Sequence, residues 1–254
     1  MTDIRKRVNS NQIKSGVYII LRLSVIVIGV RQFFLGNYNG VFMCVLTLIL
    51  FLLPTFINKR FNIVLPNTLE IIILLFIYSA EILGEVNSYY LTVPHWDTIL
   101  HTLNGFIMAG IGFALIDILN KSDKVAVSLS PVFVALSAFC FSMTTGVVWE
   151  FFEYGMDVVF QSDMQKDTII PAVSSVLFNP TGANQAITIP IESVVINGDE
   201  WPYGGYVDIG LHDTMKDLIV NFVGAVVFSI LGVLYLSGKS RFAGRFIPTS
   251  GKQD

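Results

Sequence analysis

The chain has 254 residues, of which 53% are hydrophobic and only 14% are charged, and its mean hydropathy is +0.66. Soluble globular domains carry about 25% charged residues, so this composition excludes a soluble domain and predicts a protein that crosses a membrane several times. The net charge of −3 gives no electrostatic basis for a nucleic-acid-binding function. Cys44 and Cys140 lie in separate apolar stretches, which favours small core residues over a disulfide or a thiolate metal site.

Six apolar stretches approach or exceed the roughly 20 residues that a helix needs to cross a bilayer. They are residues 17–35, 40–57, 63–83, 97–119, 129–158 and 214–237. These stretches predict an all-α membrane protein built as a six-helix transmembrane bundle. The predicted parts are an N-terminal segment (1–16), helices one to five (17–159), a cap loop (160–212), helix six (213–237) and a C-terminal tail (238–254).

Lysine and arginine gather in four segments that six crossings place on one side of the membrane. These segments are the N-terminus, the 58–62 loop, the 120–128 loop and the C-terminal tail, with Lys59, Arg60, Lys121 and Lys124 in the two loops. Cytoplasmic loops carry the excess of positive residues, so both termini are predicted to be cytoplasmic in a bacterial cytoplasmic membrane. The 160–212 loop is then extracytoplasmic.

Within the apolar stretches, Arg22 and Glu70 lie at similar predicted depths, which favours a structural ion pair between the first and third spans. The cap loop carries a partly alternating β-branched run, Ile187–Ile196, followed by Asn197-Gly198, a typical hairpin turn. Asp167–Leu177 is expected to be amphipathic or re-entrant. We expect a small extracytoplasmic cap with a β-hairpin; a solvated loop with interfacial aromatic residues is an equal alternative.

Three separated polar sets fall at the predicted outer ends of spans four, five and six. Asp97 and His101 are spaced i, i+4, Glu150 and Glu153 are spaced i, i+3, and Asp213 and Asp217 are again spaced i, i+4, so each pair shares one helix face. Polar groups at such depths are costly and mark functional sites by default. The topology therefore predicts that the three sets converge.

Several carboxylates cannot all be ionised in one low-dielectric site unless protons or a cation neutralise them. Carboxylate and imidazole ligands suit Zn, Mn or Fe, and the predicted metal ligands are Asp97, His101, Glu150, Asp213 and Asp217. Asp97 and Asp213 have an alternative role as helix N-caps. That alternative does not cover Glu150 and Glu153, which lie near a helix C-terminus, where the helix dipole disfavours negative charge.

The strings His95–His101, Trp149–Glu153 and Asp213–Asp217 resemble the D-x-x-x-H, W-E-x-x-E and D-x-x-K-D motifs of the YjdF-like family of bacterial membrane proteins. The resemblance covers mainly residues 63–237, and the Asp-x-x-x-His element is more weakly similar to VanZ-type proteins. The resemblance implies a multi-pass membrane protein and supports these site residues more than it supports a particular reaction. The long 160–212 segment departs from the family pattern.

Three functions fit this sequence. The first is a metal-dependent enzyme acting on a membrane lipid or lipid-linked envelope molecule, with Glu153 as general base, His212 as a possible acid and Lys216 holding an anionic head group. The second is an ion- or proton-coupled transporter that uses the same carboxylates. The third is a structural or regulatory membrane protein with a stabilising cation. The sequence leaves both the choice among them and the oligomeric state open.

Overall fold

The computed structural model describes residues 2–61, 63–120 and 128–250, and they fold into two compact units. The first unit comprises the chain up to Gly146 together with the residues from Asp217 onward, and the second comprises Val147–Lys216. Two helices, α7 (Pro131–Phe160) and α8 (Leu211–Leu236), contribute residues to both units. The predicted cytoplasmic loop with Lys121 and Lys124 lies outside the described residues.

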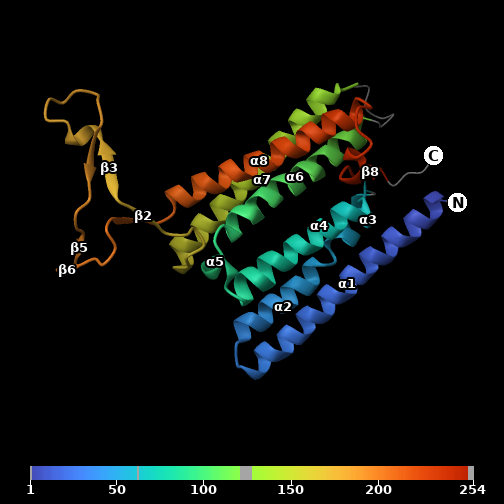
Figure 1. Cartoon of the computed structure of the whole chain (residues 1–254), viewed down its shortest axis with the longest axis horizontal. Coiled ribbons are helices and arrows are strands. Elements are labelled where there is room, and N and C mark those ends of the chain that lie inside the picture. Colours follow the sequence, from blue (N-terminus) through green and yellow to red (C-terminus); the bar gives the residue numbers. More distant parts are fainter. Residues whose placement is uncertain (1, 62, 121–127, 251–254) are drawn as a thin grey trace. The chain divides into compact units, whose positions relative to one another are not determined.

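The first unit is a layer of long helices. Helix α1 packs against α2 and α4, and α4 packs against α6, as Figure 1 shows. The helices of this unit, besides its parts of α7 and α8, are α1 (Thr2–Phe34), α2 (Tyr38–Leu50), α3 (Leu53–Phe61), α4 (Asn67–Tyr78), η1 (Ser79–Val86), α5 (Tyr89–Thr92), α6 (Trp96–Asn120) and η3 (Ala243–Arg245).

Among the described residues, five helical stretches are long and apolar enough to cross a membrane. They are Asn11–Phe34, Tyr38–Arg60, Trp96–Asn120, Pro131–Phe160 and Leu211–Leu236. The predicted third span corresponds to α4, which runs directly into the π-helix η1. This element is not among the five, so the six-span count is not confirmed, whereas the mostly helical membrane fold is.

Helices α6 and α8 approach each other closely because glycines lie at their crossing. A Cβ atom on Gly105 would sit 2.0 Å from the backbone oxygen of Asn221, and one on Gly224 would sit 2.0 Å from the backbone oxygen of Thr102. Small residues at such positions let membrane helices pack backbone against backbone. Further along the same pair, the buried rings of Phe113 and Phe228 fill the core.

Residues near both ends of the described chain contact α4 or the strand just before it. In an antiparallel two-stranded sheet, β1 (Ile63–Val64), just before α4, pairs with β8 (Thr249–Ser250) near the C-terminus. In α1, Lys14 Nζ lies 2.9 Å from Glu70 Oε2. The predicted Arg22–Glu70 ion pair is therefore wrong: Glu70 pairs with Lys14, and the Arg22 guanidinium lies 4.2 Å from the centre of the Tyr18 ring.

The second unit contains short antiparallel strand pairs. The pairs are β2 (Thr168–Ile170) with β7 (Tyr206–Asp208), β3 (Ala172–Ser175) with β4 (Ile187–Pro190), and β5 (Val195–Ile196) with β6 (Asp199–Glu200). Residues 167–177 thus form strands and the start of the short helix η2 (Val176–Phe178), and their amphipathic or re-entrant character stays a prediction.

The predicted turn at Asn197-Gly198 joins β5 to β6. Its two residues have φ angles of 55° and 96°. A two-residue hairpin loop with positive φ at both central positions matches the twist of the flanking strands, which explains the Asn-Gly pair. The side of the membrane that this hairpin faces stays a prediction.

Candidate functional site

The stretch that opens α6 is fixed by contacts to the segment before it. His95 has a φ of 61°, the left-handed conformation, and the helix begins at the next residue. The indole nitrogen of Trp96 donates a hydrogen bond to the backbone oxygen of Ser79 at 3.2 Å, and its ring packs edge-on against Tyr89. These contacts set the rotation of the first turn of α6, and therefore the direction in which its polar residues point.

The imidazole of His101 lies between two carboxylates of the first unit. His101 Nε2 is 3.4 Å from Asp97 Oδ1, one turn earlier in α6, and 3.8 Å from Asp217 Oδ2 in α8. The side chains of His101 and Asp217 are only 10% and 1% exposed, while that of Asp97 is 21% exposed. Ligand atoms of these three residues all lie within 4.8 Å of one another, a grouping that could hold a metal ion.

Two amide side chains lie about one helical turn further along α6 and α8 and bond each other. Asn221, one turn after Asp217, is 1% exposed and accepts a hydrogen bond from the Asn104 amide at 3.2 Å. The Ser142 hydroxyl donates to the backbone oxygen of Gly105 at 2.8 Å and so ties α7 to α6. Asn104 and Ser142 are not among the site residues predicted from the sequence. Asn104 could have been found, because its i, i+3 spacing from His101 places these two residues on one face of α6.

The alternative role of Asp97 and Asp213 as N-caps is wrong for both residues. Helix α6 begins at Trp96 and α8 at Leu211, so the two aspartates lie inside the first turns and not at the capping positions. A carboxylate in a first turn is still favoured by the helix dipole. That preference does not explain why Asp97 and Asp217 face the same imidazole nitrogen.

Asp213 holds the chain of the second unit in place. Its Oδ2 accepts a hydrogen bond from the Lys166 backbone nitrogen at 2.7 Å, and its Oδ1 lies 3.4 Å from Lys216 Nζ. The Gln165 amide bonds the Thr214 hydroxyl beside it. The buried Asp213 carboxylate is thus engaged by backbone and lysine partners, and the predicted head-group residue Lys216 contacts that same carboxylate.

Glu150 and Glu153 lie in the second unit on α7, and both are buried. Glu153 Oε1 accepts a hydrogen bond from the indole nitrogen of Trp149 at 2.7 Å. Beyond them, Asp157 accepts hydrogen bonds from the backbone nitrogens of Met164 and Gln165, which fixes the chain as it leaves α7. The predicted convergence of the two glutamates with His101 stays a prediction.

His212, the predicted acid, lies at the exposed start of α8. Its backbone nitrogen donates to Asp208 Oδ2 at 2.8 Å. Because Asp208 ends β7, this bond joins the last strand of the second unit to the first turn of the helix. The backbone of His212 thus helps to join strand β7 to helix α8. The role of the His212 side chain as an acid stays a prediction.

A family model described as "Predicted membrane protein (DUF2238)" matches residues 13–238. No curated protein and no solved structure matches the chain. The similarity to VanZ-type proteins therefore finds no support, and the name YjdF-like is not confirmed.

Proposed function

The chain belongs to the DUF2238 family of predicted membrane proteins, and we propose that it is a six-span protein with a divalent metal site formed by Asp97, His101 and Asp217. The observation that carries this proposal is the placement of two carboxylates around one imidazole nitrogen. We further propose that the protein is a metal-dependent enzyme that acts on a lipid or lipid-linked envelope molecule.

The spacing of the ligand atoms supports a metal over a simple ion pair. Direct charged N–H···O bonds measure about 2.7–2.9 Å. The His101 nitrogen lies 3.4 Å and 3.8 Å from the two carboxylate oxygens. Four ligands at about 2.1 Å from a tetrahedral zinc ion are separated from each other by about 3.4 Å, so a metal fits between these atoms with small adjustments.

The six-span topology is supported by contacts of residues near both ends of the described chain. Lys14 of α1 and Thr249 of β8 both lie near the start of α4, at the same end of the first unit. An even number of crossings brings two termini to the same side of a membrane. Helix α4 and η1 together contain 20 residues (12 and 8), about the number that a crossing requires.

Cysteine labelling tests this topology. In a cysteine-free background, a cysteine at Gly198 should react with an impermeant reagent added to intact cells. A cysteine at Lys59, an exposed residue of α3, should react only after permeabilisation. The reverse pattern would overturn the proposed orientation, and labelling of both sites from outside would overturn the count of six crossings.

Metal content tests the site itself. The full chain, purified in detergent without chelator, should contain one equivalent of Zn, Mn or Fe, and His101→Ala and Asp217→Asn should each lose it. Glu70→Gln removes a carboxylate that pairs with Lys14 and is the matched control, so it should keep the metal. Equal metal content in wild type and in the two site variants would overturn the proposal.

The enzymatic part of the proposal rests on Glu150 and Glu153, two buried carboxylates on one face of α7. We propose Glu150 and Asp213 as further ligands, Glu153 as general base, His212 as acid and Lys216 as a head-group contact. A metal in such a site would polarise an acyl or phosphoryl oxygen and activate water.

Two glutamine substitutions separate these roles. Glu150→Gln should lose metal and thermal stability, because a ligand that binds only the folded state stabilises it. Glu153→Gln should keep both but lose about 10²–10⁴-fold in turnover, seen as accumulation of an envelope lipid in a strain carrying only that variant. An unchanged lipid profile in both variant strains and in a deletion strain would remove the enzyme hypothesis and leave the cation site standing.

A further inference from the structure

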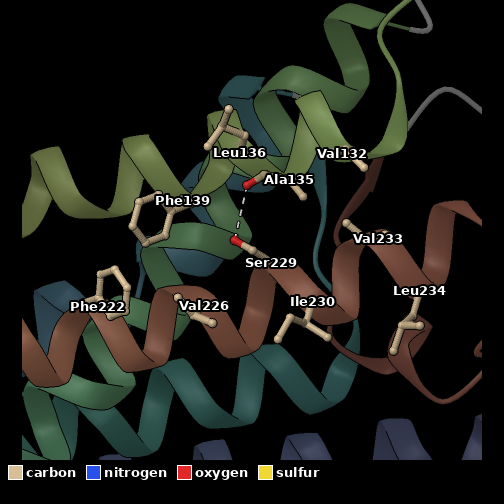
Figure 2. A pocket seen from close by; sticks show the side chains of 10 residues that line it. All are labelled: Val132, Ala135, Leu136, Phe139, Phe222, Val226, Ser229, Ile230, Val233 and Leu234. Carbon is tan, nitrogen blue, oxygen red and sulfur yellow. Dashed lines mark hydrogen bonds between the residues drawn. The ribbon is translucent and has the colours of Figure 1, made fainter.

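A groove runs between α7 and α8 on the surface of the first unit, away from the Asp97–His101–Asp217 cluster. Its volume is about 450 Å³, and nine of its ten lining residues are apolar. Figure 2 shows its walls, with Val132 and Leu136 on α7 facing Ile230 and Leu234 on α8. The tenth residue, Ser229, directs its hydroxyl to the backbone oxygen of Ala135 at 3.2 Å, so it presents no free donor to the groove.

The two ends of the groove differ. At one end, Phe139 and Phe222 meet edge to face with ring centres 5.3 Å apart and close the groove (Figure 2). At the other end, the backbone oxygen of Leu234 accepts hydrogen bonds from the nitrogens of Lys239 and Ser240, which follow α8. The groove therefore leads from an aromatic wall to the segment after α8.

That segment carries positive charge and an exposed aromatic ring. Lys239, Arg241 and Arg245 are all exposed, and no Asp or Glu occurs between residues 218 and 253. None of these three cations forms an ion pair with a described residue. The Arg245 guanidinium lies 5.3 Å from the centre of the Phe242 ring, which is 57% exposed. Basic residues beside an apolar ring suit an anionic membrane surface.

The length of the groove matches one leaflet. Phe222 and Leu234 are 12 residues apart on α8, which corresponds to about 18 Å along the helix axis. Half of a bilayer hydrocarbon core is about 15 Å thick. A chain entering beside Leu234 and ending at the Phe139–Phe222 pair would thus be about as long as one lipid tail.

We propose that this groove binds one anionic phospholipid, with an acyl chain between α7 and α8 and its phosphate at Lys239 and Arg241, the first two basic residues after α8. The apolar lining selects the tail and the charge of the segment after α8 selects the head group. The site goes beyond the metal site proposed above and does not depend on it.

Native mass spectrometry of the full chain can test this site. The protein is exchanged into detergent containing equal amounts of phosphatidylglycerol and phosphatidylcholine. We expect one phosphatidylglycerol retained per chain. Val226→Trp fills the groove and should abolish retention. Val227→Trp, at the adjacent exposed position outside the lining, is the matched control and should retain the lipid.

Charge variants keep the test decisive if Val226→Trp fails to fold. The double variant Lys239→Gln/Arg241→Gln leaves the helices untouched and should bind phosphatidylglycerol roughly 30-fold more weakly, since each basic residue near a membrane surface contributes about 1 kcal/mol. Retention of both lipids equally by wild type, or unchanged phosphatidylglycerol binding by the double variant, overturns the proposal. A dimer that dissociates in Val226→Trp would also overturn it, because the groove would then hold a second copy.

Discussion

The candidate membrane-spanning stretches of α1 and α6 have similar lengths, 24 and 25 residues, and similar apolar character, yet they differ in what surrounds them. Both contain a stretch long enough to cross a membrane, but half of the most apolar part of α6 is buried inside the protein, against 11% for α1. Large side chains such as Ile20, Val27 and Phe34 of α1 are exposed. Helix α1 is thus peripheral in the first unit, and α6 is central.

The ionisable residues of the two helices follow the same division, although the uncharged Gln32 of α1 is also buried. On α6, the His101 imidazole and the Asp97 carboxylate lie beside the Asp217 carboxylate in the protein interior. On α1, Lys14 pairs with Glu70 near the end of the helix, and both side chains are partly exposed. Ionisable side chains cost the most free energy when they are buried within a membrane protein, so they mark a functional site by default. For this reason we place the candidate site on α6 and not on the similarly apolar α1.

The largest expected contrast comes from neutralising one carboxylate in each region. Asp217→Asn should lower the free energy of unfolding by about 3–4 kcal/mol, because it removes a proposed metal ligand and a metal bound only by the folded state stabilises it by about that amount at 100–1,000 times its dissociation constant. Glu70→Gln should lower it by at most about 1 kcal/mol, because that pair is partly exposed. Denaturant unfolding in detergent, with and without chelator, measures both. Equal losses in the two variants would show that the buried Asp217 contributes no more to stability than the partly exposed Glu70.

A second contrast concerns glycines. Gly105→Ala should destabilise the protein by roughly 1–3 kcal/mol, because its Cβ would overlap the backbone oxygen of Asn221. Gly16→Ala is the matched control in α1, where an added Cβ meets nothing within 4 Å. There the substitution should be neutral or stabilise by up to about 1 kcal/mol through helix propensity. If thermal scans show a similar gain for both, α6 and α8 do not cross as closely as the glycines require.

The apolar spans follow well from the sequence because hydrophobic length is a strong constraint in a bilayer. The predicted spans 97–119 and 129–158 compare with Trp96–Asn120 and Pro131–Phe160 in the structure. The third span fits less well. Its second half is a π-helix that carries Glu81 and Glu85, and a hydropathy pattern does not distinguish that geometry from an α-helix.

The Arg22–Glu70 error has a geometric origin. The pairing assumed that Arg22 and Glu70 lie at the same depth, whereas the partner of Glu70 is Lys14, eight residues earlier in α1. Eight residues correspond to about 12 Å along a helix, so the relative depths of the two helices were misjudged by about that distance. Positions along a single span are therefore predictable only as well as its ends are.

Local spacing predicts part of the candidate site. The i, i+4 spacing correctly places Asp97 beside His101. The glycine contacts of α6 with α8, and the bond between Asn104 and Asn221, involve residues 116 or more positions apart in the chain, counting from Gly105 to Asn221. Small residues and amides are common in membrane helices, so the sequence gives no signal of which ones meet.

The smallest expected contrast is between two polar side chains, Asn221 of α8 and Ser24 of α1, that differ in their hydrogen-bond partners. Asn221 in α8 bonds the Asn104 amide of α6, while the Ser24 hydroxyl of α1 bonds only the Leu21 backbone of its own helix. Asn221→Ala should therefore cost about 1–2 kcal/mol, and Ser24→Ala close to nothing.

A double-mutant cycle isolates the interhelical bond from the loss of packing around Asn221. With Asn104→Ala as the second substitution, the coupling energy should be about 0.6 kcal/mol and no more than about 1.7 kcal/mol, the range measured for hydrogen bonds between membrane helices. The four proteins of the cycle can be unfolded in the same detergent, and a coupling within error of zero would mean that the two amides do not stabilise each other. In that case the α6–α8 crossing would depend on its glycines and apolar packing, and substitution at Gly105 should disturb the metal site more than substitution at Asn221.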